Sequence, residues 1–325
     1  MKLPSAIWRR QEFALAGFLA LALVVMSLVS RDFLSVRNLV SMPLYFVEPG
    51  LIVLAMTLAI ITGGIDLSVG STMALAAVAL GIVWGKWHLP IGAAVVAALA
   101  VGALAGAING LIVTRFGVPP LMVTLATMAS FRGLAVGLSH AEPVSDFPPS
   151  FLTLGNSTLP LGAGIAVPAQ LLFFILMAIG AGILLSRTVL GRYLYAIGHN
   201  ETAARYAGIN VNRIKLGVYT AAGLVAAMAG VIAVSRFSTA KADAGAGMEL
   251  AVITACVLGG IDIYGGRGTI LGAVLGLLII SVVDNGLQMA GVGSEARAVA
   301  VGLMLIVAVV VGQLGRRGRA GGDGE

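Results

Sequence analysis

The sequence predicts an all-α, polytopic integral membrane protein: a helical bundle of about ten transmembrane helices with an internal repeat. Its 325 residues are 59% apolar and only 10% charged, whereas soluble domains carry roughly 25% charged residues. So few polar groups cannot cover a soluble core of this size, and lipid must be the solvent for most of the chain. This composition excludes a cytosolic enzyme, a nucleic-acid-binding protein and a secreted disulfide scaffold.

The expected spans begin near the N-terminus. A hydrocarbon core of about 30 Å requires roughly 20 apolar residues per helix. The run 13–29 follows Arg9 and Arg10, and no small-residue cleavage site follows it, so we interpret it as a span rather than a signal peptide. The next two runs are short, and tilted or partly re-entrant arrangements remain alternatives for them. The expected spans are 13–29, 47–62, 72–87, 91–113, 121–138, 166–185, 216–234, 248–263, 269–289 and 296–312.

Basic residues predict the orientation. Most of the 20 Lys and Arg residues fall in alternate connections, which places both ends of the chain in the cytoplasm. The longest polar stretch without a basic residue belongs outside. No segment is long and polar enough to form a soluble ATPase domain, so residues 1–325 are expected to form one transmembrane domain. Its parts are a cytoplasmic N-terminus 1–12, an external loop 139–165, a cytoplasmic loop 187–215 and a cytoplasmic tail 313–325.

Two similar segments place an aspartate after paired glycines between apolar runs. Glycine pairs interrupt helices, and irregular backbone at membrane depth is tolerated only inside protein or along a wet cavity. The segments could be tight turns in which each aspartate caps the next helix, or part of a transport pathway, and these roles are compatible. The candidate pathway or gate residues here are Gly63, Gly64, Asp66, Ser68, Gly70 and Ser71 in the first segment and Gly259, Gly260, Asp262, Gly265 and Gly266 in the second.

A few other polar residues interrupt the apolar runs. Asn109, Asp284 and Asn285 could line the same pathway or bond a neighbouring helix. Arg132 and Arg236 lie near span ends, where we expect them to snorkel to the interface. The three histidines lack ligand spacing and the one cysteine, Cys256, sits in an apolar run, so we expect no metal site and no catalytic set.

The basic loop 187–215 predicts a short helix over 201–207. Asn200 is a good N-cap, Glu201 suits the first turn and can pair with Arg205, and Gly208 is a stop signal. A helix this short must be held against something. It could lie at the lipid headgroups or dock a cytoplasmic partner.

These motifs, in this order and over roughly residues 15–312, resemble permease subunits of bacterial ABC sugar importers, the group for ribose, xylose, arabinose, galactose, rhamnose and autoinducer-2. In such permeases a Glu-Ala-Ala loop enters a cleft of the ATPase. Here Thr202 replaces the common alanine, and the spacing to the glycine is one residue longer. By this resemblance, the residues that couple the chain to the ATPase are Gly191, Arg192, Glu201, Ala203, Ala204, Arg205 and Gly208.

The resemblance also implies the surroundings of the chain. It would be a multi-pass permease of the bacterial inner membrane, surrounded by lipid and paired with a second copy or a sister permease. A periplasmic sugar-binding protein would deliver a pentose, a deoxyhexose or autoinducer-2, and ATP would be bound by the separate ATPase, so no cofactor is expected in this chain. Two alternatives remain: a secondary transporter coupled through Asp66, Asp262 or Asp284, and a branched-chain amino-acid ABC permease, whose usual motif lacks the run 63–68.

Overall fold

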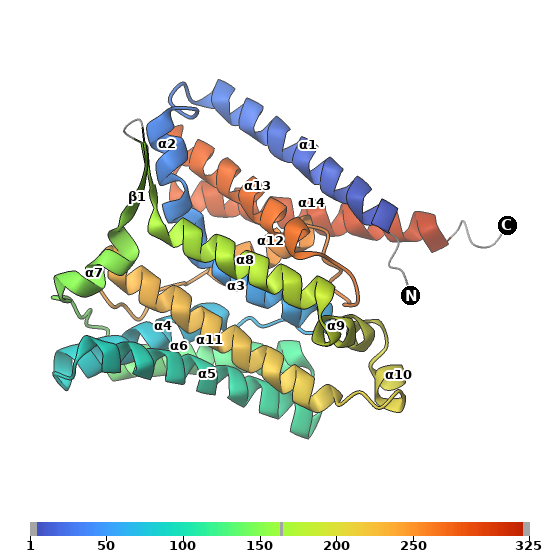
Figure 1. Ribbon diagram of the computed structural model, residues 1–325, viewed down its shortest axis with the longest axis horizontal. Helices are drawn as coiled ribbons and strands as arrows, with labels where there is room; N and C mark the ends of the chain where they lie inside the picture. Colours follow the sequence, from blue (N-terminus) through green and yellow to red (C-terminus); the bar gives the residue numbers. More distant parts are fainter. Residues whose placement is uncertain (1–4, 163–164, 321–325) are drawn as a thin grey trace.

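The computed structural model describes the backbone of residues 5–162 and 165–320 and the side chains of residues 11–160 and 166–310. Long helices run side by side along the longest axis of the molecule (Figure 1). Helices α9 and α10 lie at one end of this bundle, here called the inner end, and α7 and β1 lie at the other, the outer end (Figure 1). The start of α1 and the end of α14 lie at the inner end, as expected for a chain with both termini on one side.

Eight helical segments in the described part of the chain are long and apolar enough to cross a membrane, which confirms a polytopic helical membrane protein. They coincide with eight of the ten expected spans. The two others correspond to a short helix, α12, and to α14. The eight segments are Gln11–Val29, Val36–Ile61, Val69–Lys86, Ile91–Phe116, Pro120–Ser139, Ala169–Arg187, Val211–Phe237 and Ile270–Met289.

In the first half of the chain, two short breaks divide the helices. The second span starts earlier than expected, because α2 precedes α3 and only a break at Met42 separates them. After α3, residues 62–68 form a loop and α4 begins at Val69. The bounds are Ser5–Val29 for α1, Val36–Ser41 for α2, Pro43–Ile61 for α3, Val69–Gly81 for α4, Ile82–Lys86 for the π-helix η1, Ile91–Phe116 for α5 and Pro120–Ser139 for α6.

The outer connection contains a small helix and a hairpin. Helix α7, Pro149–Asn156, precedes the antiparallel strands β1, Thr158–Gly162, and β2, Ile165–Pro168. The expected span 166–185 therefore starts too early. Residues 166–168 belong to β2, and α8, Ala169–Arg187, begins only after Pro168.

Beyond α8 the chain forms two short helices and returns through the longest span. These are α9, Val189–His199, α10, Glu201–Tyr206, and α11, Val211–Phe237. Helix α10 confirms the helix expected over 201–207 to within one residue. Helix α11 packs closely on α5, because a Cβ at Gly106 would overlap the Tyr219 carbonyl oxygen. Small residues thus let the two backbones approach, as in other membrane helix pairs.

The expected span 248–263 is wrong in its length. Helix α12, Met248–Leu258, has 11 residues, or about 16 Å, which is about half of the hydrocarbon core. Gly259 and Gly260 end it, and residues 259–269 form a second loop before α13, Ile270–Met289. The expected span 296–312 lies in α14, Ser294–Ala320, whose side chains beyond residue 310 are outside the described residues.

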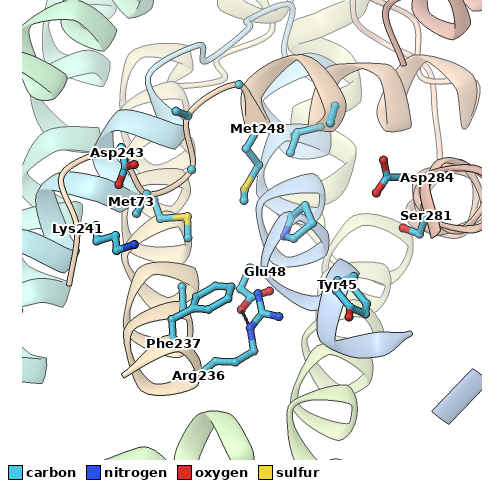
Figure 2. A pocket seen from close by; sticks show the side chains of 18 of the residues that line it. Tyr45, Glu48, Met73, Arg236, Phe237, Lys241, Asp243, Met248, Ser281 and Asp284 are labelled. Carbon is cyan, nitrogen blue, oxygen red and sulfur yellow. Dashed lines mark ion pairs between the residues drawn. The ribbon is translucent and has the colours of Figure 1, made fainter. Parts of the chain in front are cut away.

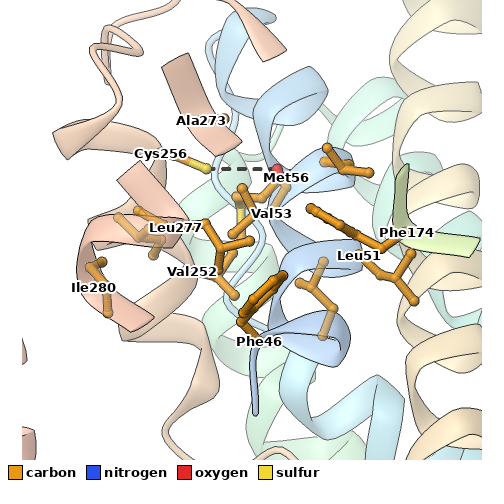
Figure 3. Close-up of a cluster of buried hydrophobic side chains, with 14 of the residues drawn as sticks. Phe46, Leu51, Val53, Met56, Phe174, Val252, Cys256, Ala273, Leu277 and Ile280 are labelled. Atoms are coloured by element: carbon orange, nitrogen blue, oxygen red, sulfur yellow. Dashed lines mark hydrogen bonds between the residues drawn. The ribbon is translucent and has the colours of Figure 1, made fainter. Parts of the chain in front are cut away.

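A buried apolar cluster joins the two interrupted helices. Figure 3 shows Phe46 and Val53 of α3 facing Val252 and Cys256 of α12 and Leu277 of α13. The Cys256 thiol is fully buried, as expected, and contacts the Val53 carbonyl at 3.8 Å. Hydrophobic contacts therefore hold α3, α12 and α13 together.

Candidate functional site

The two glycine-rich loops lie against each other at the inner end. The Gly266 N–H donates a hydrogen bond to the Ile61 carbonyl at 2.9 Å. A Cβ at Gly265 would lie 2.8 Å from the Gly63 nitrogen, and Gly265 has a φ of +88°. A side chain at Gly265 would thus be strained in conformation and in space. The inner ends of α3 and α12 therefore form one packed unit.

The two aspartates make the same local turn. Asp66 Oδ1 accepts hydrogen bonds from the Ser68 N–H at 2.9 Å and its hydroxyl at 2.6 Å. Asp262 Oδ1 accepts from the Tyr264 N–H at 3.1 Å. Such a bond from residue i+2 stabilises a turn. Asp66 is fully buried, and its turn is tied to α5 because Asn109 Nδ2 donates to Ser68 Oγ at 2.7 Å.

Other predicted gate residues pack the loops against their surroundings. A Cβ at Gly64 would overlap the Tyr219 hydroxyl of α11, and one at Gly70 would overlap the Gly245 carbonyl. Ser71 donates to the Ser68 carbonyl at 2.8 Å. Gly259 packs on the Gly272 carbonyl of α13, and Gly260 lies against Gln11 of α1.

Helix α9, which the sequence analysis did not predict, contacts both loops. A Cβ at Gly198 would overlap the Ile61 carbonyl oxygen and the Gly266 nitrogen. The Tyr195 hydroxyl donates to the Gly268 carbonyl at 2.6 Å. At the other end of α9, Gly191 packs against the last carbonyls of α8. Helix α9 therefore packs against both glycine-rich loops.

Helix α10 is fixed to this unit by charge and by apolar contact. Glu201 pairs with Arg205 at 2.7 Å and with Lys215 of α11 at 2.5 Å. Partial burial raises the pKa of Glu201, but hydrogen bonds from Lys215 and Arg205 outweigh it and hold that pKa below its ordinary value. On the other side, Ala204 is buried in a small cluster with Ile197 and Val211.

The opposite surface of α10 is open. Tyr206 is 89% exposed, and Gly208, with a φ of +81°, ends the helix as the sequence predicts. Of the residues expected to couple to a partner, Gly191 and Ala204 are buried and Glu201 is half-buried, whereas Arg192, Ala203, Arg205 and Gly208 are exposed.

A cavity of 660 Å³, shown in Figure 2, is lined by residues of α3, α11, α12 and α13 and lies toward the outer ends of α3 and α11. Glu48 of α3 and Arg236 of α11 meet at its wall, with Arg236 Nε 2.8 Å from Glu48 Oε1. The expected snorkelling of Arg236 is therefore wrong, because the side chain is held inward by Glu48. The expected snorkelling of Arg132 is also wrong, because its guanidinium donates to the carbonyls of Ala242 and Ala244 at 2.6 and 3.0 Å.

These bonds hold the segment 238–247 between the helices, where it leads into the short α12. Lys241, Asp243 and Gly245 of this irregular segment line the cavity, which is a setting in which irregular backbone is tolerated at membrane depth. Asp284 lines the cavity and pairs with Arg297 of α14 at 2.9 Å. Asn285 accepts a hydrogen bond from Asn38 of α2 at 2.9 Å. The structure therefore brings Asn109 to the inner loops, and places Asp284 and Asn285 far from them.

Comparisons with known proteins decide the family. A family described as the permease component of the branched-chain amino acid transport system matches residues 38–309. The chain belongs to this permease family. A curated relative, the autoinducer 2 import system permease protein LsrD of Photorhabdus laumondii, is 37% identical over 92% of this chain and 90% of its own length. The LsrD protein of Salmonella typhimurium strain LT2 is 36% identical over 93% of this chain and 92% of its own.

The permease is accordingly a multi-pass protein of the bacterial inner membrane, of the type found in ABC sugar importers. The resemblance drawn from its motifs is confirmed. Its curated relatives are transport proteins rather than enzymes.

The sequence did not reveal the contacts of Gly198 or the pairing of Glu48 with Arg236. The only local signal was an acidic residue within the apolar run of α3, which is costly in a membrane and points to a function.

Proposed function

We propose that this chain is the permease subunit of an ATP-driven importer for a small sugar-like molecule, with autoinducer-2 as the first substrate to test. A separate cytoplasmic ATPase would engage α10, and a periplasmic binding protein would deliver the substrate to the outer end. The observation that carries the proposal is that α9 packs against both glycine-rich loops.

The inner end has the construction that a mechanical coupling requires. Helix α10 presents Tyr206 and Arg205 to the cytoplasm, while Glu201 and Ala204 tie it to α9 and α11. A partner that pulls or pushes α10 therefore moves α9. Because Gly198 touches the backbone of Ile61 and Gly266, a movement of α9 would displace the end of α3 and the loop 259–269. An ATPase whose nucleotide states prefer different positions of α10 would shift the populations of the two states of the permease.

The substrate assignment rests on the relatives, whose printed names refer to autoinducer-2 import. Pentoses and deoxyhexoses are the neighbouring choices. The family description refers to branched-chain amino acids, which therefore serve as competitors in the test. Assembly with a second copy or a sister permease belongs to the same proposal.

Reconstitution tests it. The permease would be purified with a candidate ATPase and a candidate periplasmic binding protein and placed in proteoliposomes. We expect uptake of autoinducer-2, ribose or rhamnose that requires ATP and the binding protein and that leucine does not inhibit. Glu201→Arg combined with Gly208→Trp should abolish uptake and ATPase stimulation, whereas Gly217→Ala on α11, with no atom within 4 Å of the added Cβ, should not. Uptake driven by an ion gradient without ATP would instead identify a secondary transporter.

A further inference from the structure

The wall of the outer cavity contains a buried ion pair. Glu48 is 2% exposed and lies within the apolar helix α3, yet it carries a carboxylate that Arg236 must neutralise. Replacing a buried ion pair by apolar residues of similar volume is often neutral or stabilising. An ion pair at the wall of a membrane cavity therefore points to a function in that cavity.

We propose that this cavity is the chamber in which the permease binds its substrate during passage, and that the Glu48–Arg236 pair recognises the hydroxyl groups of a small neutral polyol. The inference rests on the proposed function, since it names the substrate class and the residues of the same transport path. The volume of 660 Å³ lies within the range of about 300–1,000 Å³ that small-molecule sites occupy.

The pair is arranged to bind hydroxyl groups. Arg236 stands 4.1 Å from the centre of the Phe237 ring, which holds the guanidinium in place beside Glu48. Among the described residues, Arg236 pairs only with Glu48, so its remaining N–H groups are free to donate to a ligand. The second carboxylate oxygen of Glu48 can accept in return. A diol offers both an acceptor and a donor, and it can bind without separating the two charges.

The rest of the lining favours a neutral ligand with an apolar face. Tyr45 and Phe237 present aromatic rings, and Ser281 adds a hydroxyl (Figure 2). Both acidic and basic groups lie on the wall, where Lys241 and Asp243 belong to one segment and Asp284 pairs with Arg297. A cation or an anion would find charges of its own sign, whereas a sugar would find donors, acceptors and rings.

Thiol labelling tests occupancy of the cavity without ATP turnover. Cys256 is the only native cysteine and is fully buried, so a membrane-impermeant methanethiosulfonate added from the outside reports on an introduced cysteine. Ser281→Cys lines the cavity, and Ser157→Cys is its exposed control at the outer connection. We expect ribose or rhamnose to slow modification at position 281 and not at position 157. Equal rates with and without sugar, or protection by leucine rather than by sugar, would overturn the proposal.

A charge-neutral double variant tests the pair itself. Glu48→Gln with Arg236→Gln removes both charges together, so no lone charge is left buried, and gel filtration of the detergent-solubilised protein checks that it folds. In the Ser281→Cys background, we expect the half-protecting sugar concentration to rise by about tenfold or more, because hydrogen bonds to charged groups are lost. Glu142→Gln is the control outside the cavity. An unchanged half-protecting concentration in the double variant would assign the pair a purely structural role.

The two proposals fail separately. Stimulation of the ATPase by the binding protein tests the importer assignment and needs no sugar contact at Glu48. Sugar protection at position 281 tests the chamber and needs no ATPase.

Discussion

Substitution of Gly198 by alanine should uncouple the permease from its energy source. The added Cβ would overlap the Ile61 carbonyl oxygen and the Gly266 nitrogen and would lie 2.9 Å from the Ile61 carbonyl carbon. All three are backbone atoms, so no side chain can rotate away. Helix α9 must therefore leave its seat, or the hydrogen bond from Gly266 to Ile61 must break.

The magnitude follows from these contacts. Overpacking costs about 1–3 kcal/mol, and a buried donor left without its acceptor costs about 1–3 kcal/mol more. Alanine gains about 1 kcal/mol over glycine in the helix itself. The net cost is about 3 kcal/mol, which lowers the equilibrium ratio of packed to displaced α9 by roughly a hundredfold.

The assay compares ATP hydrolysis with uptake in the reconstituted complex. We expect Gly198→Ala to keep the ATPase bound but to lose most of the uptake per ATP hydrolysed. Gly217→Ala, on α11 with no atom within 4 Å of the added Cβ, is the matched control and should behave as the wild type. Normal uptake by Gly198→Ala would refute the coupling route through α9.

Three further outcomes follow from the same structure. Asp66→Asn keeps the oxygen that accepts from Ser68 and should transport normally, whereas Asp66→Ala should lower stability by about 1–3 kcal/mol in a thermal shift assay; loss of transport in the asparagine variant would favour proton coupling. Because the folded pKa of Glu201 lies below its ordinary value of 4.5, its attachment of α10 is complete at neutral pH and weakens as the pH falls through that lower pKa. Hydrogen exchange of α10, corrected for intrinsic rates, should rise on acidification below pH 4.5, and Glu201→Gln should show no such rise. Arg132→Gln should release the segment 238–247 and make it sensitive to protease from the outside, whereas the exposed Arg31→Gln should not.

Local signals explain why α10 could be predicted to within one residue. Its cap, its first-turn acid, its ion pair and its stop all lie within Asn200–Gly208. The long spans were equally accessible, because each depends only on the length of an apolar run. The loops 62–68 and 259–269, which follow α3 and α12, could also be located, since paired glycines mark them in the sequence.

The missed features depend on contacts between distant parts of the chain. Glu48 and Arg236 each look like a charge near the end of a span, and only the fold brings α3 and α11 together. The run 248–263 has the hydropathy of a full span, yet α12 ends at Leu258, and the residues that follow form a loop whose Gly266 N–H bonds the remote Ile61 carbonyl. Nor does the sequence mark Gly198 as a contact, because the backbone atoms that it touches belong to two remote loops.

The same two helices join the inner loops to the outer cavity. Helix α3 carries Glu48 near its outer end and Ile61 at its inner end, and α11 carries Arg236 near its outer end and Lys215, the partner of Glu201, in its first turns. An α-helix is stiff along its axis, and the 27 residues of α11 extend over about 40 Å. A displacement of α9 and α10 would therefore act on the inner ends of α3 and α11. The outer ends of these two helices carry Glu48 and Arg236, which form one ion pair. On the proposed function and the proposed chamber, separation of the two helices would pull Glu48 from Arg236 and weaken the binding of a polyol, so that substrate release would accompany the movement of α10.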